Sequence, residues 1–174
     1  MGATHAQTLW TQDGLATTYA EQGRIGDAEV LMKETIAGLS DAYGEEHLTT
    51  LAAMTNLGEL YRMAGRTDDA EPIYLTLLER QERLYPDSSN TGIANHNLAA
   101  LYTMTDRHAD AIALFAEAER IWSDLVPIDH IYRRENTRLW AEALRGSGDI
   151  AGAEVLEARL AEIGASTEHV NPRH

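Results

Sequence analysis

The sequence contains no cysteine, and this absence excludes several kinds of site. None of the 174 residues is a cysteine, and only 4 are prolines. Without thiols the chain can form no disulfide framework, no cysteine-ligated zinc site and no thiol nucleophile. A Gly/Ser-rich linker is also missing. The composition therefore favours one domain of ordinary size over two domains joined by a linker.

Long apolar runs and basic segments are missing as well. No apolar run approaches the roughly 18 residues that are needed to span a bilayer. The opening segment "MGATHAQTLW" lacks the basic and apolar regions of a signal peptide. Ala6 stands where a myristoylation signal has Ser or Thr. We therefore expect a soluble, cytoplasmic protein that makes no contact with a membrane.

The charge balance is strongly acidic. The net charge is −14, and Lys33 is the single lysine. Because phosphate binding needs a basic face, nucleic acid is not an expected partner. The acidity either keeps the protein soluble or attracts a basic partner. Hydrophobic residues make up 44% of the chain, which is enough for a packed core.

The chain repeats itself with a period of 41 to 42 residues. The segment "NLGELYRMAGRTDDAEPIY" (residues 56–74) matches "GLATTYAEQGRIGDAEVLM" (14–32) 42 residues earlier. It also matches "NLAALYTMTDRHADAIALF" (97–115) 41 residues later, and "WAEALRGSGDIAGAEVL" (140–156) is a weaker fourth copy. Such a period indicates a repeat architecture in which each copy is one supersecondary unit.

Each copy predicts two helices joined by a short turn. In the second copy, apolar residues recur at helical spacing from Leu51 to Tyr61. Gly65 suits the left-handed cap that ends a helix, and Thr67 or Asp68 is placed to cap the next helix. The pattern predicts helices over residues 5–22, 27–42, 46–64, 68–84, 88–105, 108–125, 128–145 and 150–163.

Small residues recur at matching positions of the two predicted helices in each copy. Two helices pack closely only where small side chains let their backbones approach. In the second copy Gly58 and Ala70 would form this contact, and Tyr61 and Tyr74 would fill the space around it. The matching pairs in the other copies are Ala16 with Ala28, Ala99 with Ala111, and Ala141 with Ala153.

These motifs resemble the tetratricopeptide repeat, in the 42-residue form found in kinesin light chains. The resemblance rests on residues 56–74 and 97–115 and on the pattern His-x3-Leu at His5 and His47. It implies an all-α fold, an α-solenoid of four helix-turn-helix hairpins in a right-handed superhelix. It also implies a single domain over residues 4–163, with repeats at about 4–45, 46–87, 88–127 and 128–163, and a flexible tail over residues 164–174.

The resemblance implies that the function is to bind a protein or peptide in a concave groove. The first helix of each repeat would line this groove. Candidate groove residues lie beside the core face of these helices, and they are Trp10, Asp13, Thr17, Thr55, Asn56, Glu59, Arg62, His96, Asn97, Thr103, Arg138, Glu142 and Arg145.

Several of these residues have two interpretations. Asn56 and Asn97 match asparagines with which kinesin light chains hold the backbone of an extended peptide, or else they stabilise their own hairpins. Trp10 either anchors a partner or covers the first hairpin. The arginines either bind a carboxylate of the partner or pair with glutamates one turn away.

The sequence shows no pattern typical of catalysis or metal binding. It has no Gly-rich phosphate loop, no His-Glu-x-x-His and no Ser elbow. The segment "GEEH" (residues 44–47) offers two carboxylates and a histidine, but His47 falls on the repeat position of His5, which favours a structural role. We therefore expect no enzyme, no cofactor and no metal.

The expected function is that of a non-enzymatic scaffold or adaptor. Three alternatives remain open from the sequence. The chain is a homodimer that associates through a terminal repeat, a regulatory subunit of an enzyme or transcription factor, or a fragment of a longer repeat protein. The last predicted helix supports the first alternative, because it carries apolar residues and no capping helix is predicted after it.

Overall fold

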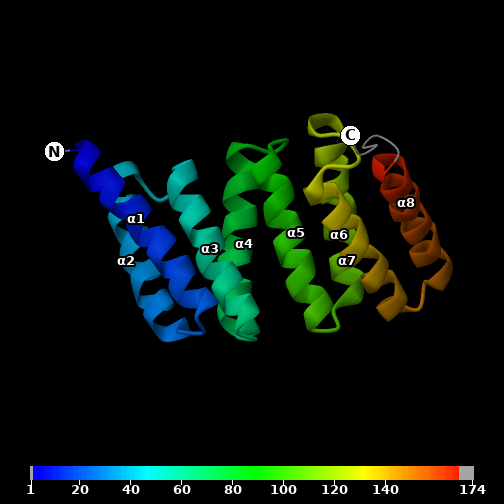
Figure 1. Cartoon of the computed structure of the whole chain (residues 1–174), viewed down its shortest axis with the longest axis horizontal. Helices are drawn as coiled ribbons and strands as arrows, with labels where there is room; N and C mark the ends of the chain where they lie inside the picture. The colour runs from blue at the N-terminus through cyan, green and yellow to red at the C-terminus, as the bar shows by residue number, and fades with distance from the viewer. Residues whose placement is uncertain (1, 169–174) are drawn as a thin grey trace. The chain divides into compact units, whose positions relative to one another are not determined.

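The chain folds into helical hairpins (Figure 1). The computed structural model describes the backbone of residues 2–168 and the side chains of residues 11–12 and 14–164. This part of the chain contains eight helices and no strand: α1 (Gly2–Glu21), α2 (Ile25–Tyr43), α3 (Leu48–Met63), α4 (Thr67–Leu84), α5 (Ser89–Met104), α6 (His108–Leu125), α7 (Ile131–Ser147) and α8 (Ile150–Glu168).

Every predicted helix is present, and the largest difference lies at the end of α8. This helix runs to Glu168 rather than Ile163, so residues 164–168 are helical where a flexible tail was predicted. The rest of the predicted tail, residues 169–174, lies outside the described residues. None of the described helices has the length and hydropathy needed to cross a bilayer.

The helices belong to two compact units, residues 1–80 and 81–174, and the boundary falls within α4. In the first unit α1 packs against α2, and α2 packs against α3. In the second unit α5 packs against α6, α6 against α7 and α7 against α8, and α5 also contacts α7. The first helices α1, α5 and α7 are therefore each covered by the helix that follows them.

A left-handed residue ends the first helix of each hairpin. The prediction for Gly65 is confirmed, with a φ of +71°. Its amide donates to the carbonyl of Arg62 at 3.1 Å, and the amide of Arg66 donates to that of Tyr61 at 2.9 Å. These two bonds satisfy carbonyls that the helix end would otherwise leave without partners. The matching residues of the other hairpins are Gly23, Asp106 and Gly148, with φ of 75°, 58° and 91°.

The predicted small positions are buried, as the repeat pattern requires. Gly58 has a more specific reason than contact with Ala70. A Cβ atom on Gly58 would lie 2.6 Å from Cε1 of Tyr74, whose side chain is fully buried. Glycine is needed here because the tyrosine ring occupies the place of a methyl group. The matching alanines Ala16, Ala28, Ala99, Ala111, Ala141 and Ala153 are each at most 2% exposed.

The prediction that Thr67 or Asp68 caps α4 is wrong. The helix begins at Thr67, so Thr67 and Asp68 lie inside its first turn rather than before it. A single residue, Arg66, separates the left-handed Gly65 from the helix, which leaves no room for a polar cap. The Arg66 guanidinium instead donates to Asp69 at 2.7 Å. The equivalent residues before α2 and α6 are also arginines without a side-chain cap bond.

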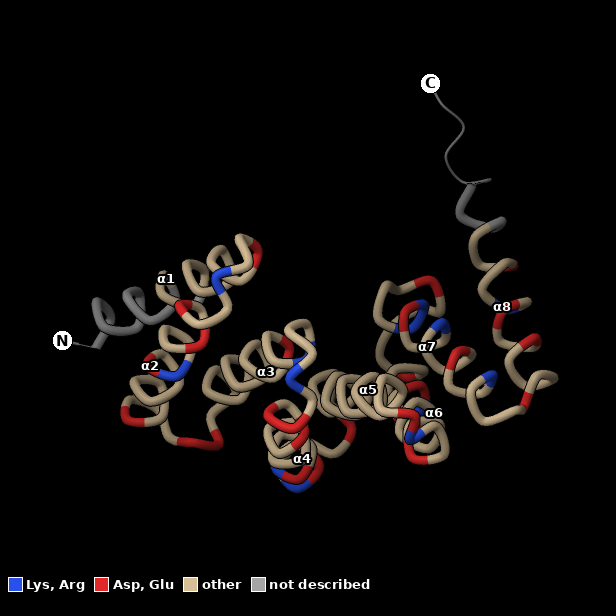
Figure 2. The backbone as a smooth tube through the Cα atoms, turned by 90° about the horizontal axis from the view of Figure 1, so that it is seen from below, with Lys and Arg blue, Asp and Glu red and all other residues tan. Residues whose placement is uncertain are grey.

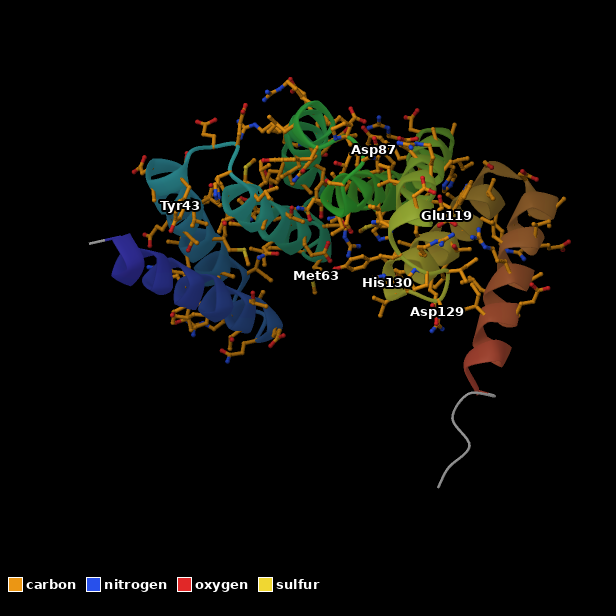
Figure 3. The ribbon with its side chains drawn as sticks, turned by 90° about the horizontal axis from the view of Figure 1, so that it is seen from above. Tyr43, Met63, Asp87, Glu119, Asp129 and His130 are labelled. Carbon is orange, nitrogen blue, oxygen red and sulfur yellow. The ribbon has the colours of Figure 1, made fainter. Side chains whose placement is uncertain are left out.

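The first helices of the later hairpins do have side-chain caps, and histidine supplies two of them. His47 Nδ1 accepts from the amide of Thr49 at 3.2 Å, and His130 Nδ1 accepts from that of Tyr132 at 3.3 Å. At the same repeat position Ser88 Oγ accepts from an amide of α5 at 3.2 Å. His47, the histidine of the His-x3-Leu pattern in the second copy, is thus a helix cap, and the side chain of His5 lies outside the described residues. His130 is labelled at the start of α7 in Figure 3.

Candidate functional site

A tyrosine, an arginine and an aspartate form the same cluster at three hairpin turns. In the second hairpin the Arg66 guanidinium lies 4.4 Å from the ring centroid of Tyr61 and pairs with Asp69. The first and third hairpins repeat the stacking at 4.0 and 3.6 Å with Tyr19 under Arg24 and Tyr102 under Arg107. These arginines are therefore engaged in stabilising their own turns. The recurrence of arginine at 24, 66 and 107 in the sequence was the signal for this cluster.

One carboxylate joins the first and second hairpins in the first unit. Glu29 of α2 accepts from Arg66 at 2.5 Å, from the Tyr61 hydroxyl at 2.8 Å and from Lys33 at 2.6 Å. The bonds from Arg66, then those from Lys33 and Tyr61, lower the pKa of Glu29 to about 2. Sequence reasoning missed this cluster because its members lie on separate helices.

The predicted groove residues of α3 form a local polar group. Arg62 pairs with Glu59 through two bonds of 2.8 and 2.5 Å, and Glu59 also accepts from the Tyr74 hydroxyl at 3.3 Å. The Thr55 hydroxyl donates to the carbonyl of Leu51 on its own helix at 3.0 Å. Asn56 is exposed one residue further along. In α1, Thr17 is exposed, and the side chains of Trp10 and Asp13 lie outside the described residues.

In α5 only one of the three predicted groove residues has an unused polar group. Thr103 is 8% exposed, and its hydroxyl donates to the carbonyl of Ala99 at 3.0 Å. His96 Nδ1 donates to Oδ1 of Asn136 at 3.1 Å, which holds α7 against α5. The half-buried Asn97 makes no side-chain hydrogen bond within the described part of the chain.

The His96 contact belongs to a buried interface. Asn136 is fully buried, and its Nδ2 also donates to the carbonyl of Phe115 on α6 at 2.9 Å. The His96 ring lies edge-on to Phe115 at 5.8 Å and tilted toward Trp122 at 5.9 Å. Because the imidazole ring packs against these aromatic residues and its Nδ1 bonds to Asn136, His96 serves to dock α7.

The arginines of α7 pair with glutamates. Arg138 lies 2.6 Å from Glu135 and 3.6 Å from Glu142, so the predicted local pairing is found there. Arg145 instead pairs with Glu157 of α8 at 2.7 Å, and not with the glutamate one turn away. These are exposed pairs, each of which contributes at most about 1 kcal/mol. Figure 2 shows the basic residues of α7 among acidic ones.

A more buried ion cluster joins α6, α7 and α8. Glu119 accepts from Arg133 of α7 and from Arg159 of α8, each at 2.6 Å. Arg133 also donates to the carbonyl of Val126 at 3.1 Å. Because their side chains are only 9% and 13% exposed, Arg133 and Glu119 are a structural pair that holds the second unit together. Glu119 is labelled on α6 in Figure 3.

The "GEEH" segment is used in packing and capping. Glu45 accepts from the guanidinium of Arg80 at 2.9 Å, and His47 caps α3. In the part of the chain that the structure describes, no group of three acidic or histidine side chains is placed to hold a metal ion.

Two family models match the chain in sequence. Both are described as tetratricopeptide repeat, and they match residues 8–49 and 50–124. No curated protein matches the chain in sequence.

Several solved structures share the fold. The kinesin light chain TPR-like repeats of Podosopora anserina superpose with a TM-score of 0.81 at 22% identity, over 92% of this chain and 76% of that one. BtubC from P. vanneervenii gives 0.82 at 21% identity, over 95% and 67%. MamA gives 0.63 at 17% identity, over 95% and 78%. The matched family models, together with these repeated hairpins, show that the chain belongs to the tetratricopeptide repeat family.

Proposed function

We propose that the chain is a non-enzymatic scaffold that binds a protein or an extended peptide through the polar faces of its first helices. The tetratricopeptide fold is that of a protein-interaction scaffold, and stacked hairpins of this kind offer extended surfaces for binding. The proposed contact residues are Asn56 and Arg62 of α3 and Asn97 of α5.

The observation that carries the proposal is Asn97. Two asparagines lie two residues apart on α5, and they behave differently. Asn95 is buried, and its Nδ2 donates to the carbonyl of Thr91 at 3.0 Å. The amide of Asn97 has no hydrogen bond within the described residues. An amide can donate to a peptide carbonyl and accept from a peptide N–H, so this side chain can recognise a backbone whatever its sequence.

The second hairpin offers a related surface. Asn56 holds the position equivalent to Asn97 and is exposed. The pair of Arg62 with Glu59 lies on the same helix, with side chains 28% and 38% exposed. Because a surface ion pair contributes at most about 1 kcal/mol, a carboxylate or a cation of a partner can replace either member at little cost. The polar surface thus combines backbone recognition with two charges of opposite sign.

The test is co-purification from the native cell with a matched pair of variants. A tagged chain with Asn56→Ala, Arg62→Glu and Asn97→Ala should lose at least tenfold of the partner that the unaltered chain recovers. The control carries Arg83→Glu, at an exposed arginine of α4, which is a second helix of its hairpin. It should recover the partner as well as the unaltered chain. Equal recovery by the triple variant, with a helical circular dichroism spectrum, would show that the first helices are not the binding surface.

A further inference from the structure

The fourth hairpin has a hollow of about 310 Å³ between its two helices. Ile131 at its edge is 72% exposed, which makes it the most exposed large apolar side chain in the described part of the chain. The remaining lining is a mixture of aliphatic and charged groups. The α7/α8 hollow is lined by Ile131, Arg134, Glu135 and Arg138 of α7 and by Leu160 of α8.

The repeat shows what occupies the equivalent place on the third hairpin. The residues of the third hairpin that lie 42 positions before the lining residues are Ser89, Gly92, Ile93, His96 and Ala118. At that place α7 itself is docked. Asn136 bonds to His96 and to a carbonyl of α6, and Tyr132 stacks on Trp122 with ring centroids 5.6 Å apart. The α7/α8 hollow is therefore the position at which a helix would dock on the fourth hairpin.

Two substitutions distinguish the fourth hairpin from the third beside the hollow. Trp122 is 1% exposed, and its indole lies against Gly92, where a Cβ atom would come within 2.5 Å of Nε1. In the fourth hairpin Gly164 replaces this tryptophan and Arg134 replaces the glycine. A Cβ atom on Gly164 would meet no atom within 4 Å. The fourth hairpin therefore has no side chain at the position of Trp122, and Gly164 lies one turn after Leu160 of the hollow.

The charge at the hollow favours an acidic ligand. Arg138 is already paired with Glu135 and Glu142. Arg134 is exposed and has no ion pair within the residues that the structure describes. An unpaired guanidinium beside an apolar surface is complementary to a carboxylate that is carried next to an apolar side chain.

We propose that the α7/α8 hollow binds an amphipathic helix of a partner protein. This helix docks as α7 docks on α5 and α6. A large apolar side chain takes the place over Gly164, and an Asp or Glu one turn away pairs with Arg134. The site does not depend on the proposed recognition by Asn56, Arg62 and Asn97, because these three residues do not line it; of the predicted groove residues with described side chains only Arg138 does.

A second molecule of this chain is a poorer match for the hollow. Its equivalent helix would be α1, which has Gln7 at the position of Tyr132 and Thr11 at that of Asn136. Neither residue supplies the large apolar side chain or the carboxylate that the site requires. Charge and shape together therefore favour a helix from a different protein.

The experiment selects ligands for the whole chain from a displayed library of 20-residue helices. The library is built on a monomeric helical scaffold, and the positions of one face are randomised. Selection should enrich helices that combine a large apolar residue with an Asp or Glu one turn away. The same selection on the Arg134→Glu variant should enrich Lys or Arg in place of the acid. Enrichment without any charge preference would overturn the proposal.

Binding of one selected helix is then measured by fluorescence anisotropy on four variants. Gly164→Trp fills the hollow and should weaken binding at least tenfold, whereas Gly164→Ala leaves it open and should keep the affinity within twofold. Arg134→Glu should weaken binding at least tenfold, and the control Arg83→Glu should not. Unchanged binding to both Gly164→Trp and Arg134→Glu would place the ligand elsewhere. Self-association in sedimentation that Gly164→Trp abolishes would show that a second molecule of the chain is the occupant.

Discussion

The guanidinium of Arg66 in the second hairpin donates to the carboxylate of Glu29 in the first at 2.5 Å. The same arginine lies over the ring of Tyr61, whose hydroxyl donates to the other oxygen of Glu29. Glu29 of α2 therefore receives bonds from α3 and from the turn that follows α3. This arrangement makes one carboxylate a structural link between two successive hairpins of the first unit.

Replacing Glu29 with glutamine should change how stability depends on pH. Its folded-state pKa of about 2 lies below the ordinary value of 4.5. The carboxylate therefore stabilises the fold above about pH 4.5, and this contribution is lost as the pH falls toward 2. At neutral pH, Glu29→Gln should cost about 1–2 kcal/mol.

Urea unfolding at a series of pH values measures both effects. The difference in stability between the unaltered chain and Glu29→Gln should shrink from neutral pH to about pH 3. Glu34→Gln is the control, because this exposed glutamate of the same helix makes no ion pair in the described part of the chain. A difference that stays constant with pH would contradict the assigned role of Glu29.

Gly58→Ala should destabilise the chain although alanine is the better helix former. Its Cβ atom would lie 2.6 Å from the ring of the buried Tyr74. Overpacking of this kind costs about 1–3 kcal/mol, which exceeds the gain of roughly 1 kcal/mol in helix propensity. We expect a net loss of about 1 kcal/mol in urea unfolding.

The first hairpin supplies the rescue for this change. Ala16 and Met32 hold the positions of Gly58 and Tyr74 there, and both are buried. The double variant Gly58→Ala, Tyr74→Met should therefore be more stable than the sum of the two single changes by about 1 kcal/mol. Additive effects would show that the ring and the methyl group do not compete for the same space.

The helices and turns were predictable because the same pattern of small, large and turn residues recurs in four copies. Gly65 and its counterparts mark the turns, and the small residue at each helix contact marks the hairpin. The spacing of apolar residues within one helix determines which face is buried, so this face can be predicted from the sequence alone. Asp106 aligns with Gly65 and with Gly148, but the sequence analysis did not predict its left-handed conformation.

The partners of polar side chains were less predictable, because they lie on other helices. Arg145 pairs with Glu157 of α8 rather than with its neighbour on α7. His96 was predicted to face a groove, and its polar nitrogen bonds to Asn136 instead. Trp122 and Gly164 hold equivalent positions in the third and fourth hairpins. The effect of such a difference can be inferred only when the packing against the next helix is known.

Asp106→Gly should stabilise the third hairpin. Asp106 has a φ of 58°, a conformation that the other hairpins give to glycine. A side chain in this region is strained, so glycine should raise the free energy of unfolding by about 0.5 kcal/mol. Asp106→Ala should lower it by a similar amount, because alanine lacks the local bonds that let aspartate tolerate this region. Thermal unfolding of the three proteins should rank Gly above Asp and Asp above Ala, and any other order contradicts the assignment.

His130 should be replaceable by serine and not by alanine. Its Nδ1 accepts from the amide of Tyr132 at 3.3 Å, and Ser88 makes the equivalent bond at the start of α5. Loss of a helix cap costs about 0.5–2 kcal/mol, whereas exchange of one acceptor for another costs little. His130→Ala should therefore lower the free energy of unfolding by about 1 kcal/mol, and His130→Ser should stay within about 0.3 kcal/mol of the unaltered chain.

The His130 ring also lies edge-on to that of Tyr132 at 4.9 Å, and this contact offers a second explanation for a loss in the alanine variant. The serine variant separates the two, because it keeps the cap and removes the ring contact. If His130→Ser were as unstable as His130→Ala in urea unfolding, the histidine would act through its ring. If only alanine destabilises, the bond to the helix terminus is what this position supplies, and the same should hold for His47 at the start of α3.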